Sequence, residues 1–160
     1  MLNYIRGGLL STPDKLIAHG CNTMGVMGAG VALAIKEKYP WAFETYANDL
    51  QAMKRDLQWH QTNDAIMGRV IYASHGGKII ANCLTQMDMG RQAIRYASYD
   101  AIDKCMKRLN NYMEQFEIAS ISMPKIGCGL GGGEWPIVEA IIAFHLKDVT
   151  VNVWELNGST

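Results

Sequence analysis

The chain has 160 residues, and its 15 Lys and Arg balance 15 Asp and Glu, so the formal net charge is zero with histidine neutral. This length predicts a single domain over residues 1–160, with a buried core and no room for a second domain of ordinary size. Neutrality excludes a global field that would coat the protein with nucleic acid or draw it onto an anionic membrane, so an anionic ligand has to be held locally.

Membrane and metal sites are not expected. No apolar run approaches the roughly 18 residues of a membrane helix, and the first residues lack the features of a signal peptide. The cysteines form no C-x-x-C pair and have no histidine at zinc-ligand spacing; they are Cys21, Cys83, Cys105 and Cys128. We therefore expect reduced thiols, no metal or cofactor, no membrane partner and a cytoplasmic location.

Strand and helix signals alternate along the chain. The first half predicts, in order, strands at 2–5 and 16–18, a helix from about 30 that ends before Pro40, a helix at 41–55 and a polar loop at 58–64. The second half predicts strands at 70–73 and 78–83 joined by Gly76-Gly77, a helix at 99–116, a strand at 118–123, a helix at 135–146 and a strand at 149–156. Successive strand–helix–strand units imply parallel pairing, while the glycine turn adds an antiparallel hairpin.

The helix that begins at Tyr99 has the clearest pattern. Its apolar residues recur at three- and four-residue steps, so we expect one face of the helix to be buried. The predicted buried residues are Tyr99, Ile102, Met106, Leu109, Met113 and Phe116.

Glycine is concentrated in two segments that each follow a predicted strand and lead into a helix. The first holds Gly20, Gly25, Gly28 and Gly30, and the second holds Gly127, Gly129, Gly131, Gly132 and Gly133. In that arrangement, unpaired backbone N–H groups and the positive end of the helix face outward together and can hold phosphate. No Asp, Glu, Lys or Arg occurs in 19–35 or 126–133, so backbone groups would have to bind the phosphate. Glycines that serve turns alone are the alternative.

Two familiar phosphate-binding motifs do not fit. The first segment lacks the G-K-[ST] ending of a P-loop. The second matches G-x-G-x-x-G at Gly127, Gly129 and Gly132, but the dinucleotide fingerprint belongs at the first strand of a unit with several strands to come. Only one helix and one strand follow Gly133, which disfavours a nicotinamide-dependent oxidoreductase.

These segments resemble the ligand loops of the macro domains that bind ADP-ribose. The resemblance is carried by His19-Gly20-Cys21-Asn22 with Met27-Gly28-Ala29-Gly30-Val31-Ala32, and by Met123-Pro124-Lys125-Ile126-Gly127-Cys128-Gly129-Leu130-Gly131-Gly132. It covers nearly the whole chain. The match is greatest to the branch with terminal ADP-ribose glycohydrolases, antitoxins that remove ADP-ribose from DNA, and ADP-ribose 1″-phosphate phosphatases.

The resemblance implies a site for every part of ADP-ribose. Adenine would lie near the Gly7-Gly8-Leu9-Leu10 turn, and Asn22 would contact the distal ribose, with capping of its own loop as the alternative role. The implied ligand-binding residues are Gly8, Leu9, Asn22, Met27, Gly28, Ala29, Gly30, Val31, Ile126, Gly127, Cys128, Gly129, Leu130 and Gly131.

The chain departs from the family at the side chains that usually act on the ligand. Many relatives have an Asp at the adenine turn where this chain has Gly8. Hydrolases similar to human MacroD proteins have an Asp where this chain has Ala32. In the glycohydrolase branch a Lys attacks the ribose and an Asp sits in the second loop, where this chain has Thr85-Gln86 and Gly131, so a covalent lysine mechanism is not supported.

His19 and Asn22 are the candidate catalytic residues. His19 matches a histidine of the phosphatase-like members and would act as a general acid or base, or stabilise charge; a packed core histidine is the alternative. Glu134 is either a group that positions water or a helix cap. Arg91 and Arg95 would either reach a terminal phosphate or be solvated, and His60, His75 and His145 are expected to be solvated.

We therefore expect an α/β protein, a three-layer α/β/α macro domain with a mixed, mostly parallel central sheet of about six strands. The expected activity is binding of ADP-ribose or a derivative with hydrolysis at the distal ribose, and the favoured reaction converts ADP-ribose 1″-phosphate to ADP-ribose and phosphate. Removal of ADP-ribose from a protein or nucleic acid, or a non-catalytic reader of ADP-ribosylated macromolecules, is the alternative.

Overall fold

The computed structural model describes residues 1–57, 65–88 and 95–156. Six strands form one sheet in the order β1-β6-β5-β2-β4-β3; they are β1 (Leu2–Arg6), β2 (Leu16–Asn22), β3 (Val70–His75), β4 (Lys78–Gln86), β5 (Ser120–Met123) and β6 (Thr150–Glu155). The described α-helices are α1 (Gly30–Lys38), α2 (Pro40–Asp56), α4 (Tyr99–Gln115) and α5 (Trp135–His145), and Leu9–Ser11 forms a short 3₁₀ helix. The predicted loop at 58–64, with His60, and Arg91 lie outside the described residues.

The sheet is mixed, as the sequence predicts. The pairs β1–β6, β6–β5, β5–β2 and β2–β4 are parallel, whereas β3 runs antiparallel to β4. The β3–β4 turn has positive φ at both Gly76 (57°) and Gly77 (81°), which suits the two-residue hairpin turn that matches the twist of the strands. Glycine adopts these angles without a steric penalty.

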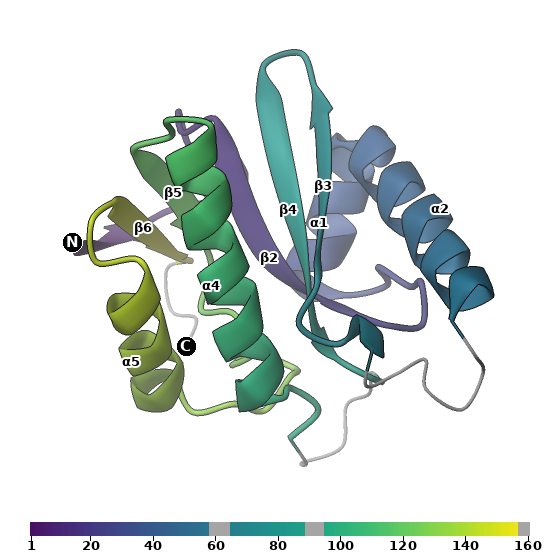
Figure 1. Cartoon of the computed structure of the whole chain (residues 1–160). Helices are drawn as coiled ribbons and strands as arrows, with labels where there is room; N and C mark the ends of the chain where they lie inside the picture. Colours follow the sequence, from purple (N-terminus) through teal and green to yellow (C-terminus); the bar gives the residue numbers. More distant parts are fainter. Residues whose placement is uncertain (58–64, 89–94, 157–160) are drawn as a thin grey trace.

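Helices cover both faces of the sheet and complete three layers (Figure 1). The core under α4 and α5 takes Leu16 and Ala18 from β2, whereas Ile17 and Cys21 of the same strand belong to the cores under α1 and α2. Alternate residues of a strand point to opposite faces, and β2 is buried on both because it lies inside the sheet.

Strand β2 separates from β5 partway along its length. It pairs with β4 from Leu16 to Asn22, with an irregularity at Cys21/Asn22, but with β5 only at Leu16 and Ile17. Beyond Ile17 the two parallel strands are no longer hydrogen-bonded partners, so the segments that follow them diverge. The space between these segments is at the carboxyl edge of the sheet, where ligands bind in open α/β folds.

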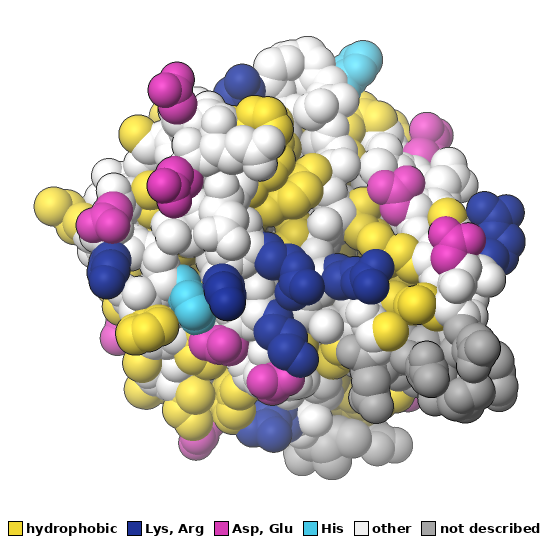
Figure 2. Space-filling view, in the orientation of Figure 1, with side chains coloured by type: hydrophobic (Ala, Val, Ile, Leu, Met, Phe, Trp, Pro, Cys, Tyr) yellow, Lys and Arg dark blue, Asp and Glu magenta, His cyan; other side chains and the backbone are white. Residues whose placement is uncertain are grey.

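Helix α4 has the predicted buried face, except that Tyr99 is only partly buried and Phe116 is exposed. Ser98 caps its first turn by accepting a hydrogen bond from Ala101 N at 3.1 Å, and the residues buried on α4 include Ile102, Met106 and Leu109. Phe116, predicted to be buried, follows the last turn and is 55% exposed. On the face of the molecule that carries α4, lysine and arginine side chains gather near the middle, among hydrophobic and acidic ones (Figure 2). No helix of the described residues is long and apolar enough to cross a membrane.

Asp14 ties together three strands at the amino edge of the sheet. Its carboxylate accepts hydrogen bonds from Ser120 and Ser122 of β5 and from Asn152 of β6, and Asp14 precedes β2. Burial acts to raise the pKa of the Asp14 carboxyl, but these three hydrogen bonds and the nearby Lys78 hold it below its ordinary value. The carboxylate thus fastens the sheet at the edge opposite the diverging segments.

We expect Asp14→Ala to lower the free energy of unfolding at neutral pH by about 2 kcal/mol, because hydrogen bonds to a charged group are lost and their donors stay partly buried. Asp49→Ala, at an exposed position of α2, is the control and should change it by less than about 0.5 kcal/mol. A folded-state pKa below the usual value stabilises at higher pH, so the difference between wild type and Asp14→Ala should shrink as pH falls below 3.8. Urea denaturation at several pH values measures this, and equal stabilities at pH 7 would contradict it.

Candidate functional site

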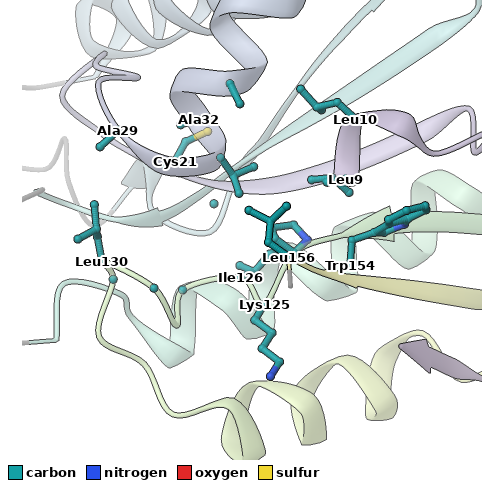
Figure 3. A pocket seen from close by; sticks show the side chains of 18 of the residues that line it. Leu9, Leu10, Cys21, Ala29, Ala32, Lys125, Ile126, Leu130, Trp154 and Leu156 are labelled. Atoms are coloured by element: carbon teal, nitrogen blue, oxygen red, sulfur yellow. The ribbon is translucent and has the colours of Figure 1, made fainter. Parts of the chain in front are cut away.

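A cleft of about 940 Å³ opens at the carboxyl edge of the sheet between the two glycine segments (Figure 3). Most of the ligand-binding residues predicted from the sequence line it: Gly8, Leu9, Asn22, Gly28, Ala29, Gly30, Val31, Ile126, Gly127, Gly129, Leu130 and Gly131. We call the segment 22–31 the first loop and the segment 126–133 the second loop. The tertiary structure thus brings together two stretches that are about one hundred residues apart in the sequence.

Asn22 organises the first loop from within. Its side-chain oxygen accepts hydrogen bonds from Met24 N (3.0 Å), Val26 N (3.3 Å) and the Tyr46 hydroxyl (2.9 Å), while its Nδ2 donates to Val26 O (2.9 Å). An amide group carries two N–H bonds, so one has no acceptor among the described residues. Asn22 therefore caps its own loop, and it also lines the cleft.

The first loop presents backbone donors at the start of α1. That helix begins without a side-chain cap and without an acidic residue in its first turn. Within the described part of the chain, no acceptor is found for the N–H groups of Gly28, Ala29, Gly30 and Val31, all of which line the cleft. Unpaired N–H groups and the positive helix end together form a site for an anion.

The second loop is compact because it lacks side chains where it folds back. Gly133 N donates to Gly127 O at 2.7 Å, and a Cβ added to Gly131 would lie only 2.6 Å from the same oxygen. Gly127 and Gly132 have φ of 76° and 75°, angles that glycine adopts readily. Tyr96 N and Ala97 N both donate to Gly131 O, which fastens this loop to the segment that leads into α4.

One end of the cleft is apolar. Leu9, Leu10, Trp154 and Leu156 line it, and the Trp154 indole N–H donates to Ser122 Oγ at 3.0 Å, which orients the ring. A Cβ added to Gly8 would meet nothing within 4 Å, so space is open above the turn. A flat, largely apolar ring fits this end, and the amide side chains of Asn22 and Gln86 also line the cleft.

Few charged side chains line the cleft, and each of them is bonded to another group of the protein. Lys38 Nζ donates to Leu10 O at 2.9 Å, and Lys125 pairs with Glu155 at 3.5 Å. In Figure 3 the Lys125 side chain points away from the glycine loops toward α5. A bound anion would therefore meet mainly backbone dipoles, as the charge-free segments of the sequence predict.

Three predicted site residues lie outside the cleft lining. Met27 is buried in the core under α1 and α2. Cys128 packs against the core under α4 and α5, and its thiol donates to Ile126 O at 3.4 Å. His19 is 1% exposed on β2. The two-residue alternation of a strand, with helices above and below, explains the burial of His19.

His19 is a satisfied core histidine. Its Nε2 lies 2.6 Å from Asn82 Oδ1 and 3.4 Å from Cys21 Sγ. Burial lowers the pKa of His19 to about 4, although the hydrogen bond to Asn82 opposes that shift. Burial also raises the pKa of the Cys21 thiol well above its ordinary value. Both groups are therefore neutral at pH 7, and Cys21 lines the cleft whereas His19 does not.

The remaining candidates are spread around the fold. Glu134 precedes α5 and makes no side-chain capping bond, and Arg95 stacks over Tyr99 with its guanidinium 4.2 Å from the ring centroid. His75 is exposed, as predicted, whereas His145 is not simply solvated, because its Nε2 contacts Asp103 at 2.7 Å. Within the described ranges, no group of three His, Cys, Asp or Glu residues could hold a metal ion.

Sequence reasoning missed the cleft residues that come from other elements. Trp154 and Leu156 at the end of β6, and Lys38 at the end of α1, line the cleft without belonging to either glycine segment. The pattern of the sequence marks Trp154 only as part of a strand. Its place in the cleft depends on β6 pairing beside β1.

Comparison with known proteins agrees with this geometry. The profile of the Macro domain family matches residues 18–142. Over 155 residues the chain is 27% identical to the DNA ADP-ribosyl glycohydrolase of Thermus aquaticus, covering 96% of this chain but 40% of that protein. Over 179 residues it is 24% identical to the ADP-ribose 1″-phosphate phosphatase of Candida glabrata, covering 97% of this chain and 98% of that protein.

Among solved structures, the macrodomain of Thermus aquaticus DarG has a TM-score of 0.78 and 28% identity, covering 97% of this chain and 98% of that chain. The predicted three-layer fold and six-stranded sheet are therefore confirmed.

The burial of His19 generates a testable pH dependence. Its folded-state pKa of about 4 is below the ordinary 6.5, so between these pH values the unfolded chain binds a proton that the folded chain does not. The free energy of unfolding should therefore fall by up to about 3 kcal/mol as pH drops from 6.5 to 4. His19→Gln, which keeps an N–H for Asn82, should lose that part of the pH dependence in chemical denaturation. Equal slopes for both proteins would contradict this assignment.

Proposed function

The chain belongs to the macro domain family, and on that premise we propose that its cleft binds ADP-ribose or a derivative and that the protein is a hydrolase acting at the distal ribose. The observation that supports this best is the set of backbone N–H groups, on both sides of the cleft, that have no acceptor among the described residues. Gly28–Val31 lie on one side, and Gly129 and Leu130 on the other. Oriented amides of this kind hold a diphosphate without a positively charged side chain.

The two ends of the cleft suggest the direction of the ligand. Adenine lies at the apolar end against Leu9, Leu10 and Trp154, and the distal ribose lies at the polar end beside Asn22 and Gln86. This direction puts the flat ring on apolar surface and the sugar hydroxyls near an amide donor that has no other acceptor. It also leaves the 1″ carbon of the ribose between the two loops.

The favoured reaction is hydrolysis of ADP-ribose 1″-phosphate. Water attacks the terminal phosphorus, the bond from phosphorus to the 1″ oxygen breaks, and that oxygen takes a proton, so the products are ADP-ribose and inorganic phosphate. The phosphatase named among the relatives aligns over almost its whole length, which supports this choice. The lysine that attacks ribose in the glycohydrolase branch has no counterpart at Thr85-Gln86.

Catalysis in this proposal comes mainly from positioning. Backbone donors fix the diphosphate, and the free N–H of Asn22 orients the distal ribose, so the attacking water meets a fixed phosphorus. His19 does not touch the ligand space; it positions Cys21 and the end of β2 through its contacts with Asn82 and Cys21.

Removal of ADP-ribose from a macromolecule is the second candidate. It is supported by the Thermus aquaticus relative named DNA ADP-ribosyl glycohydrolase, of whose length this chain spans 40%. A non-catalytic reader of ADP-ribosylated partners would use the same cleft. Product analysis separates the three: free phosphate, released ADP-ribose, or binding without either product.

Binding should depend on the shape of the second loop. Gly131→Ala places a methyl group 2.6 Å from Gly127 O, so the loop has to open, and we expect ADP-ribose to bind at least tenfold more weakly. Ser74→Ala, at an exposed position of β3 outside the cleft lining, is the control and should bind as wild type does. Calorimetric titration with ADP-ribose measures both. If no heat is detected for wild type at millimolar ligand, the binding proposal fails.

Phosphate release should depend on the amide of Asn22. We expect Asn22→Ala to lower the rate about 100-fold, as is typical when one oriented donor is lost. Tyr46→Phe is the control, since it removes one hydrogen bond to the Asn22 side chain but leaves the amide, and it should lower the rate less than tenfold. His19→Gln should lower kcat and leave KM unchanged. Rates for Asn22→Ala equal to wild type would remove Asn22 from the reaction.

A further inference from the structure

A stripe of cationic and aromatic side chains runs along the outer surface of α4. Lys104, Arg108, Tyr112 and Phe116 follow one another at four-residue steps, so they form one ridge of the helix and its end. We call these four residues, together with the adjacent exposed Lys107, the α4 stripe. Lysine and arginine side chains gather at the middle of the same face, with hydrophobic ones beyond them (Figure 2).

The cationic half of the stripe includes charged side chains that form no ion pair within the described residues. Lys104 pairs with Asp100 at 3.0 Å, but no ion pair involves Lys107, Arg108 or Arg69 within the part of the chain that the structure describes. Arg108 donates through Nη1 to Gly68 O at 2.9 Å, which holds it against the segment before β3 and leaves its other donors available. Helix α4 also carries Asp100, Asp103 and Glu114, so the positive charge is confined to the middle of this face, where the lysine and arginine side chains gather (Figure 2).

The aromatic half of the stripe extends from the edge of the core, against which Tyr112 packs, to the exposed Phe116. Tyr112 stacks on Tyr72 of β3 with ring centroids 3.8 Å apart and planes 10° apart. Phe116 lies 4.6 Å from Tyr112 at 49° and is 55% exposed. The stacked tyrosines thus support an aromatic ring that stands in solvent next to the cationic half.

Helix α4 begins beside the cleft, and Lys104, the first residue of the stripe, lies five residues along it. Tyr96 N and Ala97 N, just ahead of α4, bond to Gly131 O of the second loop, and Arg95 stacks over Tyr99 at the first turn. Helix α4 has 17 residues and is about 25 Å long at 1.5 Å per residue. A polymer that lies on the stripe would therefore have one end at the second loop.

We propose that the α4 stripe is a docking surface for single-stranded nucleic acid. Phosphates meet Lys104, Lys107 and Arg108, and a base stacks on Phe116, which is the combination of a cationic track and aromatic platforms that binds single strands without reading sequence. An acidic peptide would use the cations but gain nothing from the exposed ring. This surface goes beyond the proposed hydrolysis and does not require it, although a strand held here would present a modified end to the cleft.

Fluorescence anisotropy of a labelled oligothymidine of about 16 nucleotides tests the proposal. Binding at low salt should weaken with salt, with a log–log slope of about −2 for three phosphate contacts. Lys104→Gln/Arg108→Gln leaves one phosphate contact and should reduce the magnitude of that slope to about 0.7. Phe116→Ala should weaken binding about tenfold without changing the slope, because it removes stacking and no charge.

Controls separate this surface from the cleft and from folding. Lys54→Gln/Arg55→Gln removes the same charge from exposed positions of α2 and should bind as wild type does. Lys107→Glu, at an exposed residue with no ion pair among the described residues, should also weaken binding and covers the case in which Arg108 variants do not fold.

Three results would overturn the proposal. One is the absence of oligonucleotide binding to a folded wild type. Another is loss of binding with saturating ADP-ribose, since the oligonucleotide would then occupy the cleft. The third is equal competition by a polyglutamate peptide of the same length, which would make the surface one for acidic peptides. Because oligonucleotide binding is measured without hydrolysis, failure of the phosphatase assay leaves this result unaffected.

Discussion

The pairing of β2 with both of its neighbours is the constraint on which the site depends. Strand β2 pairs with β4 along its whole length but with β5 only at Leu16 and Ile17. The sheet is therefore continuous at its amino edge, where Asp14 fastens three strands, and open at its carboxyl edge. The first and second loops both leave the sheet at this opening. The short pairing between β2 and β5 therefore determines that a cleft forms and where it lies.

The chemistry of the cleft follows from what its loops lack. Side chains are missing where the second loop folds back on Gly127 O, and carboxylates are missing where α1 begins. The result is a set of backbone donors in a fixed arrangement, of the kind that holds a diphosphate through dipoles and not through net charge. The absence of charged side chains and the abundance of glycine in these loops thus have the same consequence, a cleft lined by backbone donors. The cationic α4 stripe lies outside the cleft.

Most of the fold and of both loops could be predicted from the sequence, because periodicity and glycine placement act locally. The predicted α4 pattern found Ile102, Met106 and Leu109 in the core. It did not find that Phe116 is exposed, because the helix ends at Gln115 and the sheet no longer covers the next residue. The burial of His19 could not be predicted either, because the sequence pattern around a histidine at the end of a strand is the same whether its side chain faces solvent, ligand or core.

The sequence by itself determined the order of strands and helices along the chain, the two charge-free glycine segments and the position of Asn22 at the end of a strand. Each of these depends only on neighbours in the chain. Only the tertiary structure decided that His19 is buried against Asn82, that Trp154 walls the apolar end of the cleft, and that Tyr72 supports Tyr112. These three facts depend on which strands pair and which helix covers them. Strand pairing brings together residues that are distant in the chain, and the local sequence pattern of one strand does not identify the strand with which it pairs.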